Sequence, residues 1–216
     1  HKVAGVDYRI VPLADYEPDI LYQKQVEAYY ADPGLNKPVG RFGNAADKWG
    51  LANWMAAAVA DEADADVGFY HIGGVRPDSI PAGGVSAAKV YGLEPFGTLV
   101  ARMEMTPAQM RRMIVSKYND PVNAKEAHRI DLISTTPYVI VTDAADNALD
   151  VQFPKLREGR KYKVAVSDYI YRNYKDMEYT GGEITVEKVA DILLEELRDD
   201  SPLKIDNTPR QRVVRK

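Results

Sequence analysis

The segment at residues 65–76 reads ADVGFYHIGGVR and combines a β-type run with a glycine turn. The run from Asp66 to His71 predicts a short strand, since its residues favour extended backbone. The glycine pair after it predicts a turn with backbone angles that other residues avoid. Consecutive glycines followed by Arg76 could place backbone amides and a guanidinium around an anion. A plain tight turn with a solvated arginine is the other interpretation of these residues.

Regular patterns on both sides of this segment predict a mixed fold. Helices are expected after the capping residue Asp19, at residues 20–30, and at residues 48–60, 86–91, 108–116 and 185–198. Strands are expected at residues 6–13, 98–105, 128–134, 138–143, 148–153 and 162–169. Because these elements follow no strict alternation and no internal repeat, they favour the α+β class, with a mixed, largely antiparallel sheet packed with helices. We expect residues 1–36 to form an N-terminal strand and connector helix, and residues 37–216 to form one domain.

Composition excludes several classes of protein. The 216 residues contain no cysteine, which excludes disulfide frameworks, thiolate zinc sites and cysteine nucleophiles. A net charge of −4 gives no general basic field, so neither nucleic acid nor an anionic membrane is an expected partner. No apolar run reaches the roughly 18–20 residues of a membrane-spanning helix. The one basic cluster, Arg210 to Lys216, is expected to be a solvated tail.

The sequence lacks the side chains that phosphate-ester chemistry requires. A two-metal phosphatase needs roughly six or more His, Asp and Asn ligands around ions about 3.5–4 Å apart. The three histidines are His1, His71 and His128, and no Asp-x-His or Gly-Asn-His-Asp run occurs. Nucleophile-elbow, phosphate-loop and His-Glu-x-x-His motifs are also missing. We therefore expect no catalytic residue, metal or cofactor in this chain.

Three ring side chains could contact a nucleoside. Phe96, between Pro95 and a glycine, and Tyr169, at the end of a strand, could each present a ring face, and stacking contributes about 1–3 kcal/mol per base. His71 could offer a ring nitrogen to the edge of a ligand. Core packing for the two aromatic rings and a half-buried position for His71 are the alternative interpretations.

In chain order, these segments resemble the successive blocks of the 5'-nucleotidase C-terminal domain over about residues 10–180. The matching blocks are KPVG at 37–40, GLANWMA at 50–56, the segment 65–76, IPAGGVS at 80–86, EPFGT at 94–98, TPAQM at 106–110 and YKVAVSDY at 162–169. In that family an N-terminal metallophosphoesterase domain carries two metals, and this C-terminal domain clamps the nucleoside between two aromatic rings. The resemblance implies a ring clamp formed by Phe96 and Tyr169, with further substrate contacts from His71, Gly73, Gly74 and Arg76.

The chain departs from the family pattern at three points. His71 stands where Asn is usual, and Tyr169 stands where Phe is common. The family's Gly-Gly-Asp after the last aromatic is missing, because residues 171–176 read YRNYKD. His71 in place of Asn affects hydrogen bonding to the edge of the base, whereas Tyr169 keeps a stacking face. The missing Gly-Gly-Asp affects the second wall of the pocket and the preference for adenine.

The resemblance implies a nucleotide- or nucleoside-binding domain of a hydrolase in nucleotide catabolism. Hydrolysis of the phosphomonoester would then belong to a metallophosphoesterase domain that binds the divalent metals, cut away or encoded as a separate chain, and this chain alone is expected to be inactive. The family implies a periplasmic, extracellular or cell-surface location. A noncatalytic interaction module that keeps the fold but not the nucleoside pocket is the alternative.

Overall fold

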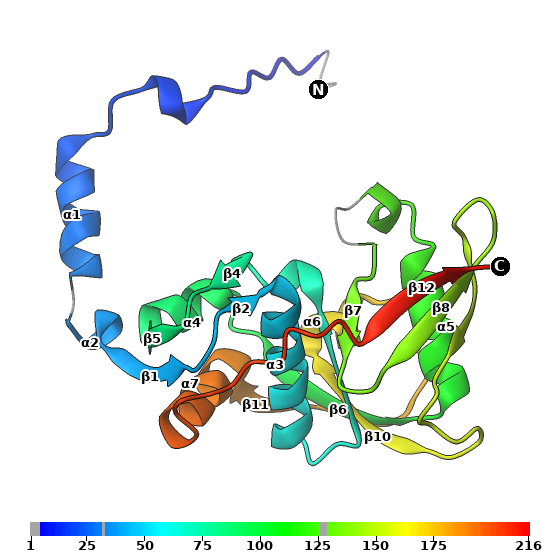
Figure 1. Cartoon of the computed structure of the whole chain (residues 1–216). Coiled ribbons are helices and arrows are strands. Elements are labelled where there is room, and N and C mark those ends of the chain that lie inside the picture. Colours follow the sequence, from blue (N-terminus) through cyan, green and yellow to red (C-terminus); the bar gives the residue numbers. More distant parts are fainter. Residues whose placement is uncertain (1–4, 32, 126–128) are drawn as a thin grey trace. The chain divides into compact units, whose positions relative to one another are not determined.

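The computed structural model describes residues 5–31, 33–125 and 129–216, in two units that divide between Asn36 and Lys37 (Figure 1). The main element of the first unit is helix α1, Ile20–Tyr30. It begins as predicted after Asp19, whose carboxylate accepts hydrogen bonds from the first backbone N–H groups of the helix at 2.9 and 3.3 Å. A 3-10 turn, Leu13–Asp15, precedes α1, and a short helix, α2, Pro33–Asn36, follows it.

The strand predicted at residues 6–13 is wrong. Residues 5–12 have no regular secondary structure, and no strand of the described residues pairs with them. A β-strand is stable only where its backbone N–H and C=O groups find partners on a neighbouring strand. An apolar pattern alone therefore did not suffice to form a strand in this segment.

The second unit is built around a five-stranded sheet with the order β11-β6-β10-β3-β7. Its strands are β3, Val67–His71; β6, Leu99–Met105; β7, Leu132–Ser134; β10, Tyr162–Ser167; and β11, Thr180–Lys188. Strands β10 and β3 are parallel and the other neighbours are antiparallel, which confirms the predicted α+β class. The strand predicted from His128 begins at Leu132, and His128 itself lies outside the described residues.

Smaller sheets complete the second unit. A three-stranded sheet has the order β12-β8-β9, formed by β8, Tyr138–Thr142; β9, Ala148–Gln152; and β12, Gln211–Arg215. Two antiparallel pairs are β1, Pro38–Phe42, with β5, Gly83–Ser86, and β2, Ala46–Asp47, with β4, Ser79–Ile80. The basic side chains Arg212, Arg215 and Lys216 are exposed, as expected for a solvated cluster. The expectation of a tail is wrong, because β12 pairs in parallel with β8.

Two helices cover opposite faces of the main sheet: α3, Lys48–Glu62, and α5, Pro107–Tyr118 (Figure 1). Successive residues of a strand point to opposite faces. Accordingly Gly68 of β3 meets α3, whereas Phe69 belongs to the buried cluster that includes Met110 and Met113 of α5. The central strands are therefore buried on both sides.

The other α-helices among the described residues of this unit are α4, Ala87–Leu93; α6, Asp168–Asn173; and α7, Val189–Asp199. Two short 3-10 turns lie at Ile72–Gly74 and Asn123–Lys125. Helix α7 is tied to α3 by the indole N–H of Trp54, which donates to Glu196 at 2.8 Å. The predicted start of α7 is wrong, since residues 185–188 continue β11 and Lys188 pairs with Leu99 of β6. Pairing with a distant strand outweighed the local helical pattern.

The contact between β3 and α3 requires a residue without a side chain. A Cβ added to Gly68 would lie 2.0 Å from the carbonyl oxygen of Ala56 and 2.8 Å from the Cβ of Ala60. Both neighbours belong to a buried helix, so neither can move without disturbing the core.

Replacement of this glycine should destabilise the protein strongly. We expect Gly68→Ala to lower the free energy of unfolding by at least about 2 kcal/mol, because overpacking here forces backbone atoms apart. Gly92→Ala in α4 is the matched control, since an added Cβ there meets nothing within 4 Å. It should be neutral or slightly stabilising. Urea denaturation followed by circular dichroism measures both, and equal midpoints for the two variants would contradict this packing.

Candidate functional site

The strands of the main sheet bring distant side chains to one edge. Strand β10 runs parallel to β3 with Val166 opposite Phe69, so the two strands end together. His71 closes β3, and Tyr169 follows β10 after two residues. Strand β7 runs antiparallel to β3 with its first residue opposite His71, which places Asp131 at the same edge.

A cleft of about 660 Å³ lies at this edge. It is lined by five of the six residues that the sequence indicated: His71, Gly73, Arg76, Phe96 and Tyr169. The sixth, Gly74, is buried behind the cleft, where an added Cβ would lie 2.6 Å from the ring of His71. A volume of several hundred Å³ suits a small organic ligand.

The loop that carries Phe96 is held by a buried carboxylate. Glu94 is 1% exposed and accepts hydrogen bonds from the backbone N–H of Phe96 at 3.3 Å and of Thr98 at 3.3 Å. It also accepts from the Thr98 hydroxyl at 2.5 Å. Between them Gly97 adopts a φ of +63°, which favours glycine. The closed loop leaves the ring of Phe96 54% exposed, with the Arg76 guanidinium carbon 4.7 Å from its centroid.

Tyr169 is the end of a stack of three rings. Its ring centroid lies 4.6 Å from that of His71 at an interplanar angle of 26°, and His71 lies 5.2 Å from Tyr70 at 24°. Tyr169 sits in the first turn of α6, where the Ser167 hydroxyl accepts from a backbone N–H at 3.3 Å. The ring remains 48% exposed, so it presents apolar surface to the cleft.

His71 contributes a ring face, and its edge is turned inward. Its Cε1 and Nε2 atoms lie against Gly74, and its Nδ1 atom is buried without a hydrogen-bond partner among the residues that the structure describes. Burial lowers the pKa of His71 to about 4, helped by the positive charges of Lys117 and Arg76 and opposed by Asp131. The imidazole is therefore neutral near pH 7, and it supports the ring of Tyr169.

A polar cluster that sequence analysis missed forms one end of the cleft. The Tyr174 hydroxyl donates to Asp131, and the Lys117 ammonium lies 3.7 Å from the same carboxylate oxygen. Lys117 also lies 5.1 Å from the centroid of the Tyr174 ring. Burial, followed by the charge of Asp131, raises the pKa of Tyr174. The only sequence signal was that Tyr174 falls in the stretch that replaces Gly-Gly-Asp.

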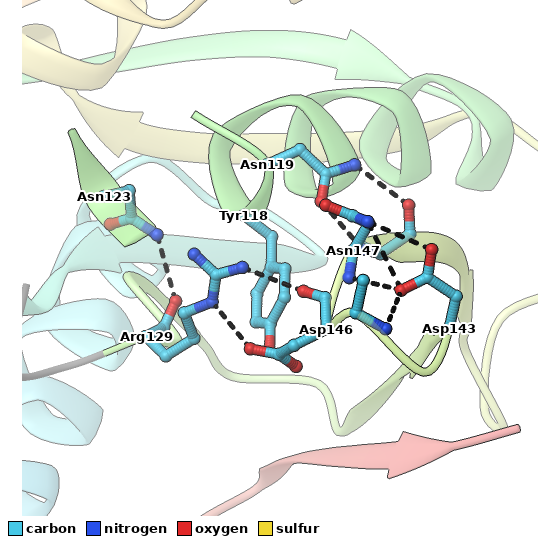
Figure 2. A network of polar contacts seen from close by, with 9 residues as sticks. Tyr118, Asn119, Asn123, Arg129, Asp143, Asp146 and Asn147 are labelled. Atoms are coloured by element: carbon cyan, nitrogen blue, oxygen red, sulfur yellow. Dashed lines mark hydrogen bonds and ion pairs between the residues drawn. The ribbon is translucent and has the colours of Figure 1, made fainter. Parts of the chain in front are cut away.

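A second network of polar contacts links residues that follow α5 to the hairpin formed by β8 and β9 (Figure 2). The side chain of Asn123, which lines the cleft, donates to the backbone carbonyl of Arg129 at 3.1 Å. Arg129 in turn pairs with Asp146 at 3.2 Å and lies over the ring of Tyr118. Asn119 exchanges hydrogen bonds of 2.7 and 2.9 Å with the backbone of β9. Asn119 and Arg129 therefore tie the described residues after α5 to the β8–β9 hairpin.

A family model, the 5'-nucleotidase C-terminal domain, matches residues 35–180. The chain belongs to this family. No curated protein sequence matches the chain. A solved 5'-nucleotidase precursor from Thermus thermophilus is similar to this domain with a TM-score of 0.72 and 17% identity, covering 91% of this chain and 44% of that one.

Two further solved structures share the fold of the domain. NAD nucleotidase from Haemophilus influenzae has a TM-score of 0.68 and 15% identity, covering 92% of this chain and 42% of that one. A sulfate thiohydrolase from Thermus thermophilus has a TM-score of 0.62 and 16% identity, covering 98% and 42%. The domain thus spans less than half the length of each of these structures. At such identities the similarity shows the fold alone.

Within residues 5–31, 33–125 and 129–216, no group of three or more His, Asp or Glu side chains is arranged to hold a metal ion. No helix in these same ranges is both long and apolar enough to cross a bilayer.

The buried carboxylate of Glu94 should be needed for the loop that carries Phe96. We expect Glu94→Ala to lower the free energy of unfolding by about 2–4 kcal/mol, because it leaves two backbone N–H groups and a hydroxyl without their acceptor. The exposed Glu195 of α7 provides the control Glu195→Ala, expected to change stability by less than about 0.5 kcal/mol. Chemical denaturation compares the two variants, and similar losses in both would argue against this role of Glu94.

His71 should make stability depend on pH between its ordinary pKa of 6.5 and its lowered pKa of about 4. Above pH 6.5 the imidazole is neutral in both states. As the pH falls below 6.5, the unfolded chain binds a proton that the folded protein refuses, so stability is lost until about pH 4. His71→Asn removes this contribution, while the other titrating groups remain. The free energy of unfolding should fall less from pH 7 to pH 5 in the variant than in the wild type, and parallel curves would refute the assignment.

Proposed function

We propose that this domain binds the nucleoside part of a nucleotide in the cleft, so that a metallophosphoesterase domain can hydrolyse the phosphomonoester. One observation carries the proposal: the half-exposed rings of Phe96 and Tyr169 line a single cleft although they lie far apart in the sequence. Exposed aromatic faces inside a cleft are unfavourable in water and favourable against the π-face of a base. The metal-bearing domain is either covalent or a separate chain.

The charges around the two rings suit a nucleotide. The Arg76 guanidinium, stacked on Phe96, and the side chains of Lys117 and Arg172 give the cleft several cations. Guanidinium groups form paired hydrogen bonds with phosphate and with ribose oxygens. The carboxylates of Asp131 and Asp168 provide acceptors for N–H and O–H groups. Apolar stacking surface and ions of both signs are the groups that a nucleotide requires.

The exposed apolar side chains of the N-terminal unit favour the presence of a partner domain. Its side chains include several exposed large apolar residues, among them Tyr8, Ile10, Leu13 and Leu21, each more than two-thirds exposed. Apolar side chains gathered in one segment are typical of surfaces that meet another polypeptide. A role in nucleotide catabolism and a periplasmic or cell-surface location are part of the same proposal and rest on the family.

Removal of either ring should weaken nucleoside binding. Titration calorimetry with AMP, adenosine and a UDP-sugar should detect binding by the wild type, and Phe96→Ala and Tyr169→Ala should each reduce affinity about 10-fold, since one stacking contact is lost. Tyr91→Ala is the control, because Tyr91 is 43% exposed on α4 and does not line the cleft. Its affinity should equal that of the wild type.

The alternative, a noncatalytic interaction module, has one observation in its favour. The ring of His71 already covers one face of the Tyr169 ring, with the two centroids 4.6 Å apart. Only the other face of Tyr169 is therefore free to stack on a base. Absence of binding at millimolar concentrations, or folded Phe96→Ala and Tyr169→Ala variants with unchanged affinity, would support the module and contradict nucleoside binding.

A further inference from the structure

We propose that Asp131 contacts the edge of the bound base and selects adenine and cytosine, which carry an amino group where hypoxanthine and uracil carry a carbonyl oxygen. This inference rests on nucleoside binding in the cleft and adds the residue that distinguishes one base from another. No sequence motif indicated Asp131, which precedes the short strand β7 and joins the site only through strand pairing.

The carboxylate of Asp131 is fixed in place and has one oxygen to spare. Its side chain is 10% exposed, and its Oδ2 atom receives both the Tyr174 hydroxyl and the Lys117 ammonium. Its Oδ1 atom has no hydrogen-bond donor among the described residues and lies 3.9 Å from the position of a Cβ added to Gly73. Asp131 lines the cleft beside Gly73. A nearly buried acceptor without a donor favours a ligand that supplies one.

The position of the cluster matches the edge of a stacked base. The ring of Tyr174 stands almost perpendicular to that of Tyr169, at 81° with centroids 6.2 Å apart. A base lying flat on Tyr169 would therefore direct an edge toward the side where Tyr174 and Asp131 stand. His71 is not available for this contact, because its ring edge faces Gly74.

The chemistry of a carboxylate determines the preference. An ionised carboxylate only accepts hydrogen bonds. The amino groups of adenine and cytosine donate, whereas hypoxanthine and uracil carry a carbonyl oxygen at the same position. In a base held in the same position, that oxygen would face Oδ1 as acceptor against acceptor, so the hydrogen bond from the amino group is lost and a repulsion is gained. The ring N–H beside the carbonyl could reach Oδ1 only if the base shifted from its position on Tyr169.

Paired ligands test this selection with the whole chain. We expect the wild type to bind AMP about 10-fold or more tightly than IMP, and CMP more tightly than UMP, by titration calorimetry. Asp131→Asn should bring each pair to within about threefold, because an amide can donate as well as accept. The exposed Asp78 provides the matched control Asp78→Asn, which should keep the wild-type ratios. If Asp131→Asn does not fold, Tyr174→Phe removes the hydroxyl that orients the carboxylate and should lower the AMP-to-IMP ratio.

Each outcome decides one of two questions. Equal affinities for AMP and IMP in the wild type, or an unchanged ratio in folded Asp131→Asn, would overturn base selection by Asp131 and leave nucleoside binding intact. Failure of every nucleotide to bind would overturn nucleoside binding and the base selection that rests on it.

Discussion

The parallel pairing of β3 with β10 is the constraint on which the site depends. It makes two strands almost a hundred residues apart end at one edge of the sheet, so that the rings of His71 and Tyr169 stack at 4.6 Å. The antiparallel neighbours β6 and β7 then bring the loop of Phe96 and the carboxylate of Asp131 to the same edge. Since α3 and α5 bury the central strands on both faces, the side chains at this edge are the part of those strands that faces the cleft.

Local chemistry explains which parts of the fold could be predicted. The strand within residues 65–76 follows from backbone preferences, and α5 begins at the Thr106 cap and Pro107 as expected. The glycine pair after that strand forms a 3-10 turn, Ile72–Gly74, in which neither glycine has a positive φ, so the prediction of backbone angles that other residues avoid is wrong there. The other wrong predictions concern pairing between distant segments: residues 185–188 extend β11, and the C-terminal residues form β12 beside β8. Strand pairing depends on a partner elsewhere in the chain, so a local pattern cannot specify it.

The same distinction applies to the site. Phe96 and Tyr169 were indicated by the resemblance to the family, through the blocks at residues 94–98 and 162–169, whereas their local signals alone left core packing open. Asp131, Lys117 and Tyr174 have no such signal, since each looks like an ordinary polar residue until strand register and the end of α5 bring them together. The cluster is formed by contacts between segments that are distant in the sequence, so no single motif could predict it.

The orientation of His71 differs from the one that hydrogen bonding to a base would require. A side chain that hydrogen-bonds a base must keep its polar edge in the cleft, whereas His71 is held between two tyrosine rings with its edge against Gly74. Burial keeps it neutral, so the ring adds stacking surface beneath Tyr169 without placing a charge there. Because β7 lies antiparallel to β3 with Leu132 opposite His71, the carboxylate of Asp131 comes to the same edge as His71. An acceptor that lines the cleft at this edge therefore comes from the start of β7, whereas the ring edge of His71 at the end of β3 faces Gly74.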